Sequence, residues 1–152
     1  MLTQRAKYGL RAMSLLAARC PQGGTMAISE LAQAGHIPPK FLEAILLDLK
    51  RHGFLTSRRG KAGGYALAQP AANIAIGDLI RALDGPLAPI PCASLTAYRP
   101  CADCTDAATC EIRRLMRQVR DAMAQILDGT TLADFAASSA AQAPVAVMAE
   151  MR

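Results

Sequence analysis

At 152 residues the chain can bury one hydrophobic core without disulfide or metal support. Its 52% hydrophobic but only 4% aromatic residues favour packed helices over a β-sandwich. It has neither the roughly 18 to 20 apolar residues that span a membrane nor a signal peptide, so we expect a cytoplasmic protein. Residues 1–70 carry ten Lys or Arg against three Asp or Glu, whereas residues 71–152 carry seven against nine. This basic first half is the candidate nucleic-acid-binding half.

Helical periodicity predicts three helices in the first third of the chain. The first runs from Thr3, which can cap its start, to Arg19. A short second helix is expected over residues 28–34. The third begins at Pro38 and Pro39, where a proline gives up only an amide without a helical partner, and continues to about His52.

Two short strands are expected next, over residues 54–58 and 65–68. The loop between them is too rich in Gly, Lys and Arg to be helical, so the segment predicts a β-hairpin with a basic tip. A further helix is expected over residues 76–83. Three helices followed by a basic hairpin is the order of a winged helix-turn-helix, and we therefore predict a mainly α-helical fold with a small β-hairpin over residues 1–84.

The third helix and the hairpin are the candidate DNA-contacting segments. A recognition helix buries its apolar face and presents polar side chains to base edges in the major groove. A wing needs cations for phosphate or a narrow minor groove, and glycine where the backbone approaches DNA closely. The alternative is an ordinary core helix beside a solvated hairpin. The predicted DNA-contacting residues are Pro39, Lys40, Glu43, Arg58, Arg59, Gly60 and Lys61.

Residues 85–110 show no sustained periodicity and form a proline-rich loop, which in a compact domain is either disordered or crosslinked. The loop contains four of the five cysteines: Cys92, Cys101, Cys104 and Cys110. Four thiolates can bind an iron–sulfur cluster or a tetrahedral zinc, and geometry alone permits either. A thiol–disulfide switch without metal, for instance between Cys101 and Cys104, is the third possibility. Cys20, outside the loop, is expected to be a small buried residue.

Apolar residues return every three or four positions from Glu111 to Leu127, opposite a row of arginines. One helix beyond a small domain has little of its own chain to pack against, so this stripe predicts a dimerisation helix, with packing into the monomer core as the alternative. A last short helical segment is expected from Thr131. We therefore assign residues 111–137 to the dimerisation helix and a terminal segment, and residues 138–152 to a flexible tail.

Several of these segments resemble the Rrf2-type bacterial transcriptional regulators, the group that contains the IscR, NsrR and RirA repressors. The resemblance covers roughly residues 1–135. Its most specific element is the Arg-Gly-x-x-Gly-Gly-Tyr motif of the hairpin. The resemblance as a whole is carried by residues 8–13, 37–43, 49–55, 57–68 and 76–80 with Asp84-Gly85.

The resemblance implies a homodimeric repressor that binds a pseudo-palindromic DNA operator and is not an enzyme. It implies that Lys40 and Glu43 read the major groove and that Arg59 and Gly60 enter the minor groove. Members of the family hold a 2Fe-2S or 4Fe-4S cluster with three cysteines of this loop and one external ligand, and thereby sense iron, nitric oxide or redox status.

This chain departs from the family pattern in its ligand set. Cys101 is an additional cysteine, and Arg113 stands where one member offers a histidine ligand. The resemblance therefore favours a cluster bound within one subunit by Cys92, Cys101, Cys104 and Cys110. A thiol oxidoreductase, the rival enzyme class, would need the Cys-x-x-Cys pair at a helix start in an α/β frame, which the sequence does not predict.

Overall fold

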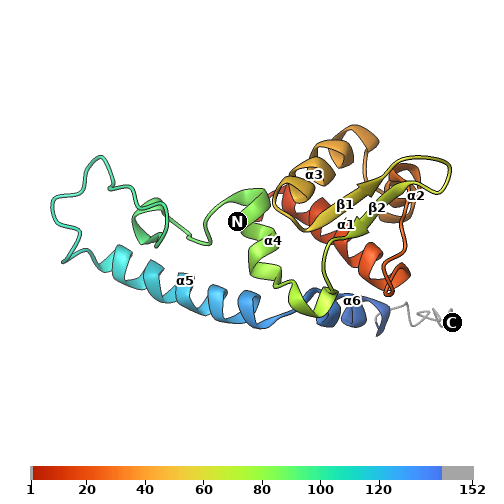
Figure 1. Ribbon diagram of the computed structural model, residues 1–152. Helices are drawn as coiled ribbons and strands as arrows, with labels where there is room; N and C mark the ends of the chain where they lie inside the picture. Colours follow the sequence, from red (N-terminus) through yellow and green to blue (C-terminus); the bar gives the residue numbers. More distant parts are fainter. Residues whose placement is uncertain (1, 142–152) are drawn as a thin grey trace, which may run out of the picture.

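The computed structural model describes residues 2–141, which form helices and one β-hairpin (Figure 1). The mainly α-helical winged helix-turn-helix fold is as predicted. The α-helices are α1 (Gln4–Arg19), α2 (Ile28–Gly35), α3 (Pro39–Arg51), α4 (Ile76–Asp84), α5 (Glu111–Gly129) and α6 (Leu132–Ala141). The strands are β1 (Leu55–Arg58) and β2 (Gly64–Leu67), and two short 3-10 helices are η1 (Ala71–Asn73) and η2 (Pro91–Ala93).

Local chemistry sets the ends of the first three helices. The Thr3 hydroxyl accepts a hydrogen bond from the Ala6 amide at 3.2 Å and so caps α1. Helix α2 ends at Gly35, and the left-handed backbone of the following His36 (φ 49°) turns the chain towards α3. Pro39 opens α3 as expected.

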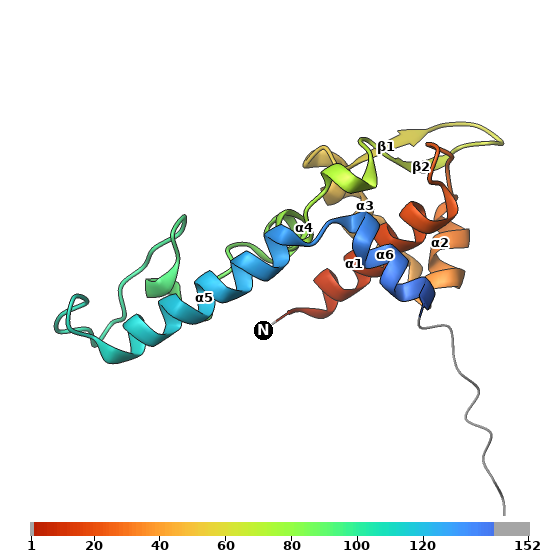
Figure 2. The same cartoon turned by 90° about the horizontal axis from the view of Figure 1, so that it is seen from below.

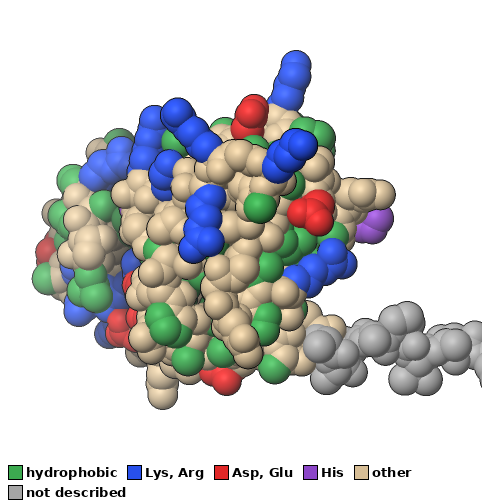
Figure 3. Space-filling view, turned by 45° about the vertical axis from the view of Figure 1, so that its right-hand side comes forward, with side chains coloured by type: hydrophobic (Ala, Val, Ile, Leu, Met, Phe, Trp, Pro, Cys, Tyr) green, Lys and Arg blue, Asp and Glu red, His purple; other side chains and the backbone are tan. Residues whose placement is uncertain are grey.

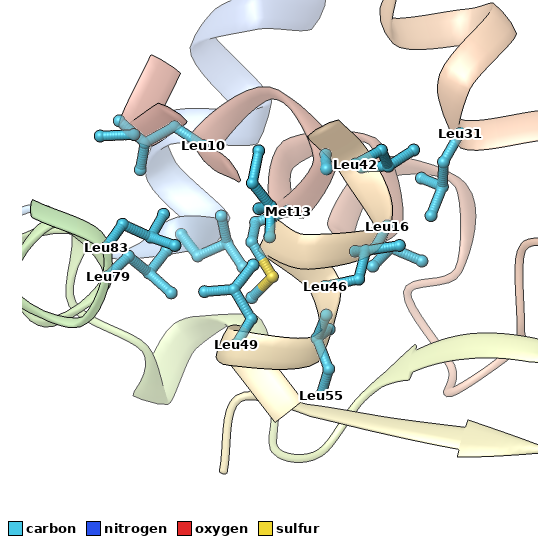
Figure 4. Close-up of a cluster of buried hydrophobic side chains, with 14 of the residues drawn as sticks. Leu10, Met13, Leu16, Leu31, Leu42, Leu46, Leu49, Leu55, Leu79 and Leu83 are labelled. Atoms are coloured by element: carbon cyan, nitrogen blue, oxygen red, sulfur yellow. The ribbon is translucent and has the colours of Figure 1, made fainter. Parts of the chain in front are cut away.

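The hydrophobic core lies where α1, α3 and α4 meet, and Leu31 of α2 and Leu55 of β1 close its edges (Figure 4). Helices α1 and α4 approach closely because Gly9 has no side chain: a Cβ there would lie 2.3 Å from Leu83 Cδ1. The other labelled members of the core are Leu10, Met13, Leu16, Leu42, Leu46, Leu49 and Leu79.

The hairpin is antiparallel, with Leu55 opposite Leu67 and Arg58 opposite Gly64. It is fastened to the segment before α2 by two backbone hydrogen bonds between Met26 and Tyr65, of 2.9 and 2.8 Å. The backbone of Gly64 (φ +149°) passes so close that a Cβ there would lie 2.3 Å from the Met26 carbonyl oxygen. The hairpin therefore has a defined position against α1–α3.

Helix α5 extends away from the helices around α3 (Figures 1 and 2). The loop 85–110 leads outward from α4 beside the N-terminal half of α5, and the helix then runs back towards α4. Helix α6 then returns to α1. Two backbone hydrogen bonds secure this return, from Leu132 N to the Ile74 oxygen at 2.8 Å and from Ile76 N to the Thr130 oxygen at 2.9 Å.

Helix α6 continues to Ala141, so residues 138–141 are helical where the sequence predicted a tail. The Ser138 and Ser139 hydroxyls donate to carbonyl oxygens one turn earlier, and alanine is the best helix former. The rest of the expected tail lies outside the described residues. Within residues 2–141, no helix is both long and apolar enough to cross a membrane.

Candidate nucleic-acid interface and cysteine loop

Helix α3 has one buried and one exposed face. Leu42, Ile45, Leu46 and Leu49 are buried in the core, as expected. Pro39, Lys40 and Glu43 are exposed. The polar N-terminal end of the helix is therefore available to a ligand, while its opposite face is fixed by the core.

The hairpin tip presents the other predicted residues, Arg58, Arg59, Gly60 and Lys61, all exposed. Gly60 adopts a positive φ of +107°, and its carbonyl accepts the Gly63 amide at 2.9 Å, which closes the turn. The Thr25 hydroxyl donates to the Ala62 carbonyl at 3.0 Å and ties the tip to the segment before α2. Lys and Arg side chains gather over the upper part of Figure 3, the level at which α3 and the hairpin lie in Figure 1.

Sequence reasoning missed the residues that hold these segments together. Lys50 Nζ donates to Ser57 Oγ at 2.6 Å and links the end of α3 to β1. Arg11 Nη1 donates to the Gly35 carbonyl at 2.9 Å, which fixes the turn before α3 to α1. Both depend on contacts between distant parts of the chain, although the basic residues themselves were visible in the sequence.

The four loop cysteines differ in burial and neighbours. Cys92 lies in η2 and is only 4% exposed, whereas Cys101 and Cys104 are exposed and Cys110 is half-buried. The Cys101 thiol donates to Cys92 Sγ at 3.8 Å. This hydrogen bond, together with the electrostatic effect of Cys92, raises the pKa of the Cys101 thiol. The structure brings these two sulfurs together. Within residues 2–141, however, no three His, Cys, Asp or Glu side chains are grouped so that they could hold one metal ion, so the predicted set of four cysteines is not assembled.

Cys110 and Cys20 occupy helix ends. Cys110 is the N-cap of α5, and its sulfur accepts the Arg113 amide at 3.4 Å. Cys20 follows α1, half-buried and packed against the core, so it is less buried than the sequence suggested.

Two arginines of α5 bind the backbone of the cysteine loop. Arg113 Nε donates to the Cys92 carbonyl at 2.9 Å, and its Nη1 donates to the Ala107 carbonyl at 3.2 Å. Its guanidinium also lies over the Tyr98 ring, 5.6 Å from the centroid. Arg120, only 6% exposed, donates to the Ala93 carbonyl at 2.6 Å. The loop is therefore attached to α5 through its main chain.

The other end of α5 is attached to α4. Arg81 forms two hydrogen bonds of 2.8 Å with the Asp128 carboxylate and another, at 3.0 Å, with Asp78. The hydrogen bonds from Arg81 lower the pKa of Asp128, and those to Asp128 raise the pKa of Arg81. Gly77 permits this contact, since a Cβ there would lie on the Asp128 carboxylate.

Most of the apolar stripe of α5 lies outside the monomer core, and only its last residue, the half-buried Leu127, packs against that core. Ile112 is 67% exposed and Ile126 68%, and Leu115 and Val119 are exposed as well. Arg120 is the buried residue of this helix. The alternative that this stripe packs into the core of its own monomer therefore holds for Leu127 but is wrong for the four exposed residues.

A core-anchored helix with an exposed polar end, beside a basic wing, defines a winged-helix DNA-binding protein. The chain belongs to the Rrf2 family: the family's profile, described as "Iron-dependent Transcriptional regulator", matches residues 2–138. It is therefore a transcriptional regulator rather than an enzyme, as expected from the sequence.

Similar proteins extend over almost the whole chain. An rrf2-like HTH-type transcriptional regulator of Rhodobacter capsulatus is 42% identical over 140 residues, which are 91% of this chain and 93% of that protein. The HTH-type transcriptional regulator CymR of Bacillus subtilis is 33% identical over 135 residues, covering 89% of this chain and 88% of the relative.

Solved structures agree with this assignment. The structure of B. subtilis CymR, titled the global cysteine regulator, has a TM-score of 0.74 at 31% identity and covers 91% of this chain and 97% of that one. T. potens IscR also has a TM-score of 0.74, covering 95% and 91%; at 24% identity it supports the fold alone. The family is thus the one that the wing motif indicated.

Proposed function

We propose that the protein is a sequence-specific, homodimeric DNA-binding repressor whose cysteine loop holds an iron–sulfur cluster. The observation that carries the DNA-binding part is the exposure of Lys40 and Glu43 on a helix whose opposite face is fixed in the core. This arrangement presents polar side chains at a constant position and angle. Such preorganisation is what discrimination between base edges requires.

Helix α3 and the hairpin contact different parts of the DNA. Lys40 and Glu43 contact base edges in the major groove, with Pro39 setting the helix entry. Arg58, Arg59 and Lys61 attract phosphates or the narrow minor groove, and Gly60 permits close backbone approach. The Lys50–Ser57 hydrogen bond helps to keep the two contact regions in register.

The exposed stripe of α5 supports a dimer. Side chains as large as Ile112, Leu115 and Ile126 standing in solvent on one helix are the expected face for a second copy. A two-fold axis between two α5 helices would place two winged modules on one DNA duplex, which accounts for a pseudo-palindromic operator.

The loop thiols fit a cluster in chemistry and, for one pair, in spacing. Thiolates about 2.3 Å from a tetrahedral metal lie about 3.8 Å from each other. Cys92 and Cys101 have this separation of 3.8 Å, and Cys104 and Cys110 lie in the same loop. These four residues would hold the cluster, which when bound supplies a group that responds to iron, nitric oxide or redox conditions. Arg113 positions the Cys92 backbone from α5.

A continuous series of contacts runs from this loop towards the DNA-binding helices. Arg113 and Arg120 connect the loop to α5, and Arg81 connects Asp128 of α5 to α4. Helix α4 packs against α1 and α3. A change in the loop can therefore shift α5 relative to α4, and thus the spacing of the two wings in a dimer.

DNA binding is tested by selection from random duplexes, followed by fluorescence anisotropy on the selected site. We expect one sequence optimum with two related half-sites. Lys40→Ala and Glu43→Ala should lose preference at particular base pairs, whereas Arg99→Ala, in the loop beside α5, should not. An absence of sequence preference would contradict the proposal.

The cluster is tested on protein purified without oxygen. Native mass spectrometry and absorbance near about 400 nm should show a dimer carrying iron and sulfide. Cys101→Ser should lose this signal, and Cys20→Ser, outside the loop, should keep it. A colourless protein with one zinc per chain, or equal operator affinity with and without the cluster, would refute the sensing part.

A further inference from the structure

One pair of loop cysteines is arranged for a chemistry other than metal binding. Cys92 and Cys101 lie nine positions apart in sequence, yet their sulfurs are 3.8 Å apart. A disulfide brings two sulfurs to about 2.05 Å, so each has to move by less than about 1 Å. One partner is buried and the other exposed to solvent, as in pairs where an accessible thiol is oxidised and a neighbour resolves it.

The backbone around this pair is held from several sides. Arg113 binds the Cys92 carbonyl, Arg120 binds the carbonyl of the next residue, and the Arg99 amide donates to the Pro91 carbonyl at 3.4 Å. The last contact brings the chain back beside η2 just before Cys101. Cys104, by contrast, is linked to Cys101 through a backbone hydrogen bond of 3.3 Å. The contact between the two sulfurs, held by these backbone contacts around η2, favours Cys92 over Cys104 as the partner of Cys101.

We propose that, when the loop holds no metal centre, Cys92 and Cys101 form a reversible disulfide with a hydroperoxide as oxidant. This inference deepens the proposed function and rests on it, because the proposed function makes these two thiols ligands of the cluster. It also replaces the Cys101–Cys104 pairing that the sequence suggested.

The reaction proceeds in two balanced steps. The exposed Cys101 thiol gives up its proton and its sulfur attacks the terminal peroxide oxygen. The O–O bond breaks, Cys101 becomes a sulfenic acid, and the leaving oxygen takes up the proton and departs as water (as an alcohol, if the peroxide is organic). The Cys92 sulfur then attacks the Cys101 sulfur, the S–O bond breaks, and a second water leaves with the Cys92 proton. Two thiols lose two electrons and two protons to the peroxide. A dithiol reductant reverses the change by thiol–disulfide exchange.

The disulfide has a direct consequence for the loop. A sulfur in a disulfide is no longer a thiolate and cannot serve as an ordinary cluster ligand. The oxidised loop keeps only Cys104 and Cys110 as free thiols. Oxidation of the metal-free protein should therefore prevent reloading until a reductant is added, so that recovery depends on thiol reduction as well as on iron.

The pairing is tested by mapping the metal-free full-length protein after treatment with excess hydrogen peroxide and alkylation of free thiols. Cleavage before aspartate gives peptides 84–102, 103–105 and 106–120. A Cys92–Cys101 disulfide lies inside peptide 84–102, whose mass falls by two hydrogens and which takes no alkyl group. Any disulfide to Cys104 or Cys110 would instead join two peptides, or a peptide to the segment 103–105. Joined peptides, or alkylation of both cysteines in 84–102, would overturn the pairing.

Variants give an independent check. Cys101→Ser should abolish the change in peptide 84–102, and Cys104→Ser, the matched exposed control, should retain it. Cys92→Ala should leave a sulfenic acid at Cys101 that dimedone traps. Trapping at Cys104 instead would contradict the assigned order.

Reloading separates this inference from the cluster proposal. Iron and sulfide are added anaerobically to oxidised protein before and after treatment with dithiothreitol. Cluster formation only after reduction supports both the cluster proposal and the Cys92–Cys101 disulfide. If reduced protein takes up no cluster but the mapped disulfide is present, the cluster proposal fails and the disulfide stands; equal reloading of both samples would overturn the proposed consequence.

Discussion

Replacement of Gly64 by alanine tests how the wing is held. A Cβ at this position would lie 2.3 Å from the Met26 carbonyl oxygen and 2.5 Å from its carbonyl carbon, and both are backbone atoms with little freedom to move. The hairpin must then move away from the segment before α2, which breaks the two backbone hydrogen bonds between Met26 and Tyr65. Each contributes about 0.5–1.5 kcal/mol net, and the unfavourable φ of +149° costs a further 1–3 kcal/mol or so.

We therefore expect Gly64→Ala to lower the free energy of unfolding by about 2–6 kcal/mol. Gly53→Ala is the matched control, since Gly53 also has a positive φ (+80°) but an added Cβ would meet nothing within 4 Å. That variant should lose only about 1–2 kcal/mol. Urea unfolding followed by circular dichroism measures both values.

The Gly64→Ala and Gly53→Ala variants should also differ in DNA binding. Gly64→Ala displaces the wing with Arg58, Arg59 and Lys61, so operator affinity measured by anisotropy should fall by about tenfold or more, equivalent to about 1.4 kcal/mol. Gly53→Ala should bind nearly as the unchanged protein does. Equal losses of stability and affinity in the two variants would refute the idea that close approach to Met26 positions the wing.

Three further perturbations have defined outcomes. Lys61→Ala should weaken binding to all DNA sequences alike and reduce the slope of log affinity against log salt by about 1; a sequence-dependent loss would contradict a phosphate contact. Asp128→Asn removes the partner of Arg81. Arg81 lowers the pKa of Asp128 in the folded protein. The Arg81–Asp128 ion pair therefore stabilises the fold at pH values above the ordinary carboxyl pKa, and this stabilisation disappears as the pH falls through the lowered pKa of Asp128. Both groups are partly exposed, so the effect is about 0.5–1 kcal/mol, and the melting temperatures of variant and unchanged protein should differ at pH 7 and converge in acid. Leu46→Ala should cost about 2–5 kcal/mol of unfolding free energy and its exposed neighbour Leu47→Ala less than about 0.5; similar urea midpoints would contradict the assigned core face.

Much of the fold follows from local pattern. The 3.6-residue periodicity of α1 and α3, the proline at the start of α3 and the glycines of the hairpin each specify one local geometry, and each appears where it was expected. The end of α6 was missed because a run of alanine and serine carries no amphipathic signal. Its helix is stabilised by propensity and by packing against α1.

The candidate site divides in the same way. The sequence by itself determined which residues are basic, which are cysteines and which helix face is apolar, because periodicity and composition are properties of neighbouring residues. It could not determine which cysteine lies beside Cys101, since Cys92 lies there in a loop whose backbone Arg113 and Arg120 bind from α5. Nor could it reveal that Arg81 joins Asp128 across 47 positions. Such contacts depend on chain closure over long distances, and only the tertiary structure decides them.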